Sequence, residues 1–172
     1  MSLRHAVLGL LSEEPGSGWD LMQKFDISLR HAWTATQSQV YGELAKLADT
    51  GLITVAEEGP RGRKVYEITQ EGRVELRRWM IDVAPRPRRD DLILRVFFLN
   101  AVSPEEARAF LSRIAEAASE RHEELRELHD RIDWSDDALS VYGALALDWG
   151  LRLEAMQREW ADWARTKLRD QT

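Results

Sequence analysis

The chain has 172 residues, with 24 Lys and Arg against 30 Asp and Glu, and it contains no Cys. This length suits one ordinary domain or two small ones, and the composition excludes a disordered chain. The absence of Cys excludes a disulfide scaffold, an iron–sulfur cluster and a thiol nucleophile. The net charge of −6 argues against a protein that coats nucleic acid without regard to sequence. No run approaches the ~20 apolar residues of a membrane span, and the first five residues do not open a secretory signal, so we expect a cytoplasmic protein that does not associate with membranes.

In chain order, the first elements are three predicted helices. Apolar residues at helical spacing predict a helix over residues 3–11, which Pro15 and Gly16 end, and a second helix that opens at Ser17 or Gly18. Thr36 and Gln39 have the spacing of a capping box, in which each side chain satisfies the other residue's backbone amide. They predict the start of a third helix. Its buried face is expected to comprise Val40, Leu44 and Leu47, and Gly51 is expected to end it.

Two short β-rich runs come next, residues 53–55 and 65–68, on either side of a turn-rich loop with three basic residues. Residues 69–72 then lead into a fourth helix, whose apolar face includes Leu76, Trp79 and Met80. The order helix, helix, helix, hairpin, helix is typical of a winged helix-turn-helix domain, whose third helix enters the major groove of DNA.

The segment 84–89, Ala-Pro-Arg-Pro-Arg-Arg, is the best candidate for a domain boundary, because proline cannot continue a helix. We therefore predict a winged-helix DNA-binding domain over residues 1–85 and a helical dimerisation domain over residues 86–172. The predicted fold class is mainly α with a small β-hairpin.

The second domain is predicted to be almost entirely helical. It opens with a strongly apolar helix over residues 92–101, and Ser103, Pro104 and two glutamates form a start signal for a long helix. A last helix carries bulky residues in steps of three and four, a pattern made to meet another helix. We therefore expect a homodimer. The predicted dimer interface comprises Trp149, Leu153, Met156, Trp160 and Trp163.

The candidate DNA contacts lie on the third helix and in the basic loop. Opposite the core face of that helix stand small or polar residues, Ser38, Gly42, Ala45 and Asp49, which would let its backbone sit deep in a groove. The basic loop would contact phosphates. Either surface could instead be an ordinary solvated face. The predicted DNA-binding residues are Thr36, Gln37, Ser38, Gln39, Tyr41, Lys46, Arg61, Arg63 and Lys64.

No pattern predicts catalysis, a metal site or a cofactor. The glycines form neither a dinucleotide-binding nor a phosphate-binding loop, and the carboxylates follow helical charge patterns. His122 and His129 lie seven residues apart on one predicted helix, too far for a shared ion. Trp149, Trp160 and Trp163 could line an aromatic pocket, but packing at an interhelical interface is the favoured interpretation.

The chain resembles the PadR family of transcriptional regulators. The segment 38–47 followed by Gly51-Leu52 is similar to the family's recognition-helix signature, and residues 66–72 match its Tyr-x-Ile-Thr-x-x-Gly pattern. Residues 92–99 and 103–107 look like the helical C-terminal domain of its long-tailed subgroup. Two departures are Gly42, where the family usually has Pro, and Trp19, where it usually has Tyr.

This resemblance implies a homodimer that binds a two-fold-related operator in double-stranded DNA and usually represses transcription. Some such proteins are released from DNA by a small-molecule effector. The alternative that the residues leave open is a ligand-binding or protein-interaction dimer whose winged helix does not bind DNA, which the acidic net charge and Glu57 and Glu58 favour.

Overall fold

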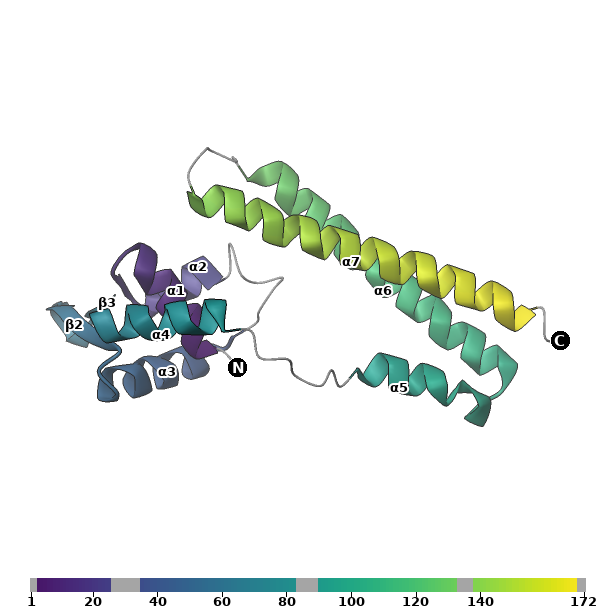
Figure 1. Ribbon diagram of the computed structural model, residues 1–172, viewed down its shortest axis with the longest axis horizontal. Coiled ribbons are helices and arrows are strands. Elements are labelled where there is room, and N and C mark those ends of the chain that lie inside the picture. Colours follow the sequence, from purple (N-terminus) through teal and green to yellow (C-terminus); the bar gives the residue numbers. More distant parts are fainter. Residues whose placement is uncertain (1–2, 26–34, 83–89, 133–137, 170–172) are drawn as a thin grey trace. The chain divides into compact units, whose positions relative to one another are not determined.

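The computed structural model describes residues 3–25, 35–82, 90–132 and 138–169 (Figure 1). The chain divides into two compact units, Met1–Arg86 and Pro87–Thr172. The predicted boundary after residue 85, the connection around residues 31–33 and the start of the last helix at residues 135–137 lie outside the described residues. No helix among the described residues is long and apolar enough to cross a membrane.

The N-terminal unit has the predicted winged helix-turn-helix order. Its elements are α1 (Leu3–Glu13), β1 (Gly16–Ser17), α2 (Gly18–Lys24), α3 (Gln37–Asp49), β2 (Ile53–Glu58), the 3-10 turn η2 (Pro60–Gly62), β3 (Lys64–Ile68) and α4 (Gln70–Ile81). The hairpin is confirmed, but the sheet has a third strand, because Gly16 and Ser17 pair antiparallel with Tyr66 and Val65. The sheet order is β1-β3-β2.

One hydrophobic core holds the N-terminal unit together. Its largest fully buried side chains come from the first three helices and from β2, and each stabilises the fold by about 2 kcal/mol through removal of apolar surface from water. They are Val7, Leu8, Leu11, Leu21, Val40, Leu44, Leu47 and Ile53.

The apolar face predicted for the fourth helix is only partly buried. Leu76 packs against the core, but Trp79 and Met80 are exposed on α4. The Trp79 ring stacks on the His5 imidazole of α1 with 4.6 Å between ring centroids, so its contact is with a neighbouring helix rather than with the core. Burial lowers the pKa of His5, against the opposing effect of the Glu75 carboxylate beside it.

The C-terminal unit contains α5 (Asp91–Phe97), the 3-10 turn η3 (Leu99–Ala101) and two long helices, α6 (Pro104–Arg131) and α7 (Ala138–Arg169). The predicted start at Ser103 is confirmed, because its hydroxyl accepts from the Glu106 amide while the Glu106 carboxylate accepts from the Ser103 amide. These hydrogen bonds lower the pKa of Glu106.

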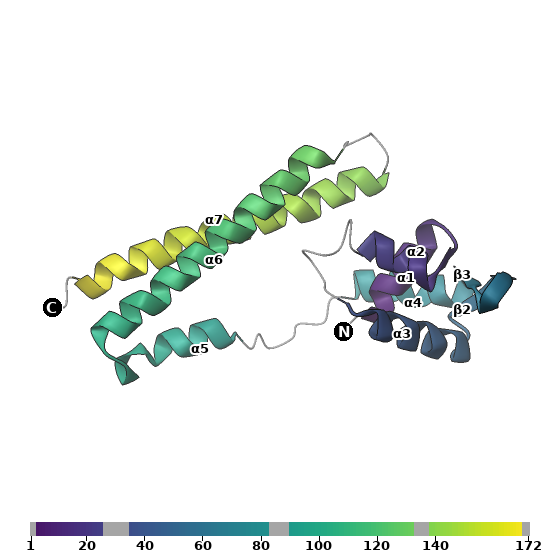
Figure 2. The same cartoon turned by 180° about the vertical axis from the view of Figure 1, so that it is seen from behind.

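The helices α6 and α7 run side by side in opposite directions (Figure 2). The Arg165 guanidinium donates to the Ser112 hydroxyl at 2.9 Å, and Arg121 pairs with Glu154 at 3.0 Å. The buried face between them consists mainly of alanines and leucines, among them Ala107, Leu111, Ala118, Leu147 and Ala161.

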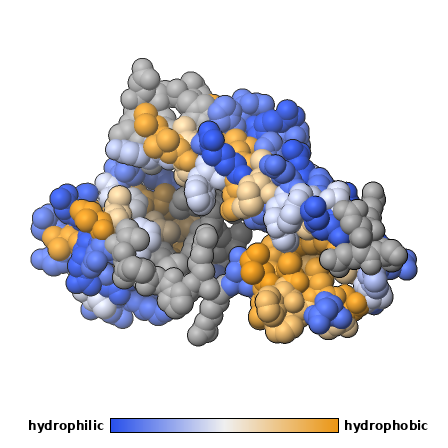
Figure 3. Space-filling model, turned by 45° about the vertical axis from the view of Figure 1, so that its right-hand side comes forward, coloured by the Kyte–Doolittle hydropathy of each residue, from blue (hydrophilic) through white to orange (hydrophobic). Residues whose placement is uncertain are grey.

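The bulky residues predicted as a dimer interface face away from α6. Trp149, Met156 and Trp163 are each more than half exposed, while Leu153 and Trp160 are partly buried. The short helix α5 also buries none of its own residues, and Phe97 is 79% exposed. Figure 3 shows a broad hydrophobic area at the lower right of the view, where α5 lies.

Candidate nucleic-acid interface

The third helix presents the surface that its sequence predicts. The Gln39 amide donates to the Thr36 hydroxyl, and the Thr36 amide donates to the Gln39 side chain at 2.9 Å, so the capping box fixes where α3 begins. Val40, Leu44 and Leu47 are buried, which forces the opposite face outward. The outward-facing residues are Gln37, Ser38, Gln39, Tyr41, Gly42, Ala45, Lys46 and Asp49.

Two glycines position α3 relative to the sheet. Gly51 has φ +70° and turns the chain from α3 into β2, and its carbonyl accepts a 2.8 Å hydrogen bond from the Thr69 hydroxyl. Gly72 lies in the first turn of α4, where a Cβ would collide with the Leu52 carbonyl oxygen. The absence of a side chain at Gly72 therefore allows α4 to lie directly against the end of α3 and the start of β2.

The wing consists of β2, η2 and β3. Its tip is closed by a 2.7 Å hydrogen bond from the Gly59 amide to the Arg63 carbonyl, and Gly62 has φ +77°. The Lys64 ammonium lies 3.6 Å from the Glu58 carboxylate. The backbone of Arg61 lies in η2 at the tip, whereas its side chain lies outside the described part of the structure.

A carboxylate that the sequence interpretation missed connects the wing to α2. One oxygen of Asp20, Oδ2, accepts hydrogen bonds from the Ser17 hydroxyl at 2.7 Å, from the Ser17 amide at 2.8 Å and from the Arg63 guanidinium at 3.1 Å. The hydrogen bonds from Ser17, reinforced by the Arg63 cation, lower the pKa of Asp20. Asp20 is therefore an ionised acceptor, and Arg63 is bound to it in the free protein.

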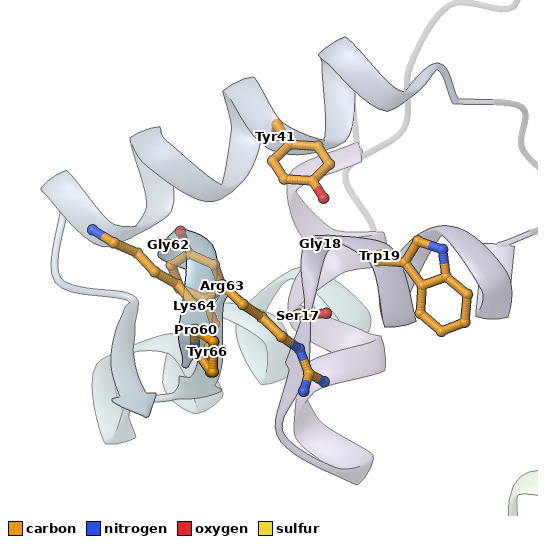
Figure 4. Close-up of a pocket in the computed structure, with 9 residues that line it drawn as sticks. All are labelled: Ser17, Gly18, Trp19, Tyr41, Pro60, Gly62, Arg63, Lys64 and Tyr66. Atoms are coloured by element: carbon orange, nitrogen blue, oxygen red, sulfur yellow. The ribbon is translucent and has the colours of Figure 1, made fainter. Parts of the chain in front are cut away.

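The wing, α3 and the β1–α2 corner line an open hollow of about 700 Å³ (Figure 4). The Tyr41 side chain points from α3 toward Gly18, so closely that a Cβ on Gly18 would lie 2.6 Å from the tyrosine ring. Three predicted residues, Tyr41, Arg63 and Lys64, line the hollow. Sequence reasoning did not assign the other lining residues to the site: Ser17, Gly18, Trp19, Pro60, Gly62 and Tyr66.

The remaining predicted contacts on α3 do not line the hollow. Thr36, Gln37, Ser38 and Gln39 form the exposed N-terminal end of the helix. Lys46 lies farther along the helix and pairs with Glu43 at 3.6 Å. Two signals bear on the missed residues: the glycine-rich segment 16–18 followed by an aromatic residue, and Tyr66 at the start of the family pattern.

Three basic side chains of this face are paired with neighbouring acids. Lys46, Arg63 and Lys64 are each within 4 Å of a carboxylate oxygen, those of Glu43, Asp20 and Glu58 respectively. All three basic side chains are about half exposed or more, so solvent and a polyanion can both reach them. Among the side chains that the structure describes, the positive charge of Lys46, Arg63 and Lys64 is therefore paired with carboxylates and open to exchange.

Two family models match the chain. Residues 7–78 match the transcriptional regulator PadR-like family, and residues 88–169 match the family described as virulence activator alpha C-term. The chain is 37% identical to the negative transcriptional regulator PadR of Bacillus subtilis over 61% of its length, and 39% identical to a probable transcriptional regulator of Mycobacterium tuberculosis over 48%. The matches span 60% and 45% of the lengths of these two curated relatives.

Solved structures match nearly the whole chain. Bacillus subtilis PadR in complex with operator DNA superposes with a TM-score of 0.82 at 28% identity, over 98% of this chain and 99% of that one. The same protein in complex with p-coumaric acid gives 0.83 at 28% identity, over the same shares. The Vibrio cholerae virulence activator AphA gives 0.85 at 27% identity, over 99% of this chain and all of that one.

These relatives are transcriptional regulators and not enzymes, as expected for a chain without a catalytic motif. The chain therefore carries a domain of the transcriptional regulator PadR-like family over residues 7–78, followed over residues 88–169 by a helical domain of the virulence-activator type.

Proposed function

We propose that this chain is a homodimeric, cytoplasmic repressor that binds operator DNA through α3 and the wing. The observation that carries the proposal is the outward face of α3, where Gly42 and Ala45 leave the backbone accessible while Gln39 and Tyr41 stand beside it. The wing places Arg63 and Lys64 across the hollow that they line together with Tyr41. Similarity to PadR in complex with operator DNA supports the same use of this face.

In this proposal the contacts divide into two kinds. Gln39 and Tyr41 reach base edges, and the end of α3 formed by residues 36–38 lies along the DNA backbone together with Lys46 and the wing cations. The Arg61 side chain is assigned to the same backbone contact from its place in the sequence. Base contacts determine which operator is bound, whereas phosphate contacts set affinity for any duplex.

The exposed face of α7 supports the homodimer. Trp149, Met156 and Trp163 recur at intervals of seven residues and are 65%, 53% and 55% exposed. An exposed apolar stripe on a long helix is normally covered by another apolar helix face. The α7 helix of a second copy of this chain carries the same stripe and could cover it. Leu153 and Trp160 lie on the same side of α7 and complete the proposed interface.

A small-molecule effector that releases the DNA is the remaining part of the proposal. Similarity to PadR in complex with p-coumaric acid supports it, and the tryptophans of α7 could contact a planar aromatic compound. Thermal-shift titration of the full chain with p-coumaric acid tests it, because a ligand of the folded state raises the melting temperature. No shift at millimolar concentration would exclude this compound as the effector.

Replacing the wing cations should weaken DNA binding without changing its sequence preference. For the double variant Arg63→Ala/Lys64→Ala, we expect the slope of log K against log salt to flatten by about 0.9 for each phosphate that the protein no longer neutralises. Fluorescence anisotropy with operator and mixed-sequence duplexes measures both slopes. Arg113→Ala, at an exposed position on α6, removes one cation outside the proposed interface and should leave the slope unchanged. An unaltered slope in the double variant would remove the wing from the interface.

Displacing the Tyr41 ring should change sequence preference. A Cβ on Gly18 would push into that ring, so we expect Gly18→Ala to reduce operator affinity by about tenfold, the effect of removing one base-edge interaction, while affinity for mixed-sequence DNA stays the same. Gly16→Ala is the matched control, since a Cβ there meets only the Asp20 Cβ at 3.6 Å. Selection from a random-sequence pool measures the preference. An unchanged preference in a folded Gly18→Ala protein would contradict the role given to Tyr41.

The alternative function is a winged-helix dimer that binds a ligand or a protein partner and no DNA. It is favoured by the acids that neutralise Lys46, Arg63 and Lys64 and by the net charge of −6. Titration of the full chain with its own upstream DNA separates the two functions. Binding below micromolar concentration that resists competitor DNA supports the repressor, whereas no binding at low salt supports the alternative.

A further inference from the structure

The Asp20–Arg63 pair differs from the other ion pairs on this face. Lys46–Glu43 lies within one helix, Lys64–Glu58 joins the two strands of the wing, and both pairs have N···O distances of 3.6 Å. Asp20 and Arg63 are 43 residues apart, and their 3.1 Å contact is a hydrogen bond between α2 and the wing. It is therefore the pair that ties the charge of Arg63 to the helix-turn-helix.

Asp20 is held so that it cannot follow Arg63. The Ser17 hydroxyl and amide both donate to the oxygen that Arg63 contacts, at 2.7 Å and 2.8 Å. The bond from the amide belongs to the capping box of α2, in which the Ser17 hydroxyl also accepts from the Asp20 amide. Ser17 also pairs with Val65 in the sheet, so the acceptor is fixed from two sides. Any movement of the guanidinium toward a ligand must therefore break its hydrogen bond to Asp20.

The chemistry of the pair is the chemistry of a phosphate contact. A guanidinium binds carboxylate and phosphate oxygens with the same planar fork of donors. The Arg63 side chain is 59% exposed, whereas Asp20 is 31% exposed, so a phosphate can approach the arginine from the solvent side. Asp20 thus offers Arg63 the same kind of acceptor oxygen that a DNA phosphate would offer.

We propose that Asp20 is an intramolecular competitor of DNA phosphate for Arg63, and that it sets the affinity of the winged helix for DNA. This inference rests on the proposed DNA-binding function. In the free protein the carboxylate neutralises Arg63 and lowers its contribution to binding of any duplex. On a tightly bound operator, Arg63 exchanges the carboxylate for a phosphate.

A double-mutant cycle on the full-length chain tests the competition. The four proteins are wild type, Asp20→Asn, Arg63→Gln and the double variant, and the probe is a mixed-sequence duplex of about three helical turns at low salt. We expect Asp20→Asn to raise affinity about two- to fivefold, the range for an exposed ion pair, because Arg63 then needs no exchange of partner. In the Arg63→Gln background the same substitution should give a clearly smaller gain.

Removing any carboxylate lowers repulsion of DNA, so the control must remove an equal charge. Glu57→Gln does so on the exposed side of β2, and no ion pair joins Glu57 to Arg63 among the described residues. We expect Glu57→Gln to raise DNA affinity by the same factor in the wild-type and the Arg63→Gln backgrounds. An equal gain from Asp20→Asn in both backgrounds, or a loss of affinity, would overturn the competitor role.

The wild-type protein supplies a second measurement that does not depend on a variant folding correctly. The guanidinium nitrogen resonances of Arg63 should shift when the protein is saturated with operator DNA, as the acceptor changes from carboxylate to phosphate. Resonances that stay in place in a DNA complex also overturn the inference. If wild type binds no duplex at all, the proposed function fails and this inference fails with it; if it binds and the cycle is additive, only this inference fails.

Discussion

Gly72→Ala should unfold the N-terminal unit at much lower denaturant than wild type. A Cβ at this position meets the backbone carbonyl of Leu52 and the Ile68 side chain, and backbone cannot move aside without shifting β2. We expect a loss of about 3 kcal/mol in the free energy of unfolding, the upper part of the range for overpacked sites. Urea denaturation followed by circular dichroism measures it.

Gly9→Ala is the matched control for this substitution. Gly9 also lies within a helix, but a Cβ there meets nothing within 4 Å. The helix propensity of alanine should then stabilise the chain by about 1 kcal/mol. If both variants were stabilised, the close approach of α4 to the Leu52 carbonyl would not exist in solution.

Trp149→Arg should convert the proposed dimer into a monomer. Truncation of a buried aromatic anchor typically costs about 2 kcal/mol of binding free energy. A two-fold interface contains each substitution twice, so the free energy of dimerisation should weaken by about 4 kcal/mol. The dissociation constant of the dimer should rise about a thousandfold. Sedimentation equilibrium measures this constant. Operator affinity should fall as the dimer dissociates, because in the proposed complex each protomer contacts one half-site.

Glu159→Arg introduces the same side chain on the same helix at an exposed polar position. We expect the dimer to persist in this variant. The helicity of both proteins should equal that of wild type, since Trp149 is 65% exposed within its own chain and does not support the packing of α7 on α6. A dimer that survives Trp149→Arg would remove this face of α7 from the interface.

The elements that sequence reasoning placed correctly are those with local signals. The capping box at Thr36 and Gln39, the spacing of the buried leucines and the glycine stop at Gly51 all act within a few residues, and the structure has each of them. The predicted DNA contacts follow directly from that helix, because a buried face at helical spacing determines which residues face outward.

The features that sequence reasoning missed depend on distant contacts. The strand β1 has only two residues, too few for an alternating pattern, and it exists because β3 pairs with it. Asp20 reads locally as a capping residue, and nothing nearby in the sequence connects it to Arg63. For α7, bulky aromatics mark one face, and only the structure shows that the opposite face, with Leu147, Glu154 and Ala161, meets α6.

The position of β2 at the edge of the sheet gives its acids a role separate from DNA. With the order β1-β3-β2, one side of β2 has no neighbouring strand within the described sheet, and such an edge can pair with another molecule and lead to aggregation. Charged side chains and irregular pairing both hinder that addition. Glu57 and Glu58 supply the charge, and the register shift between Val55 and Glu57 supplies the irregularity. The acids beside the wing cations are therefore expected to hinder the addition of another copy's strand to this edge.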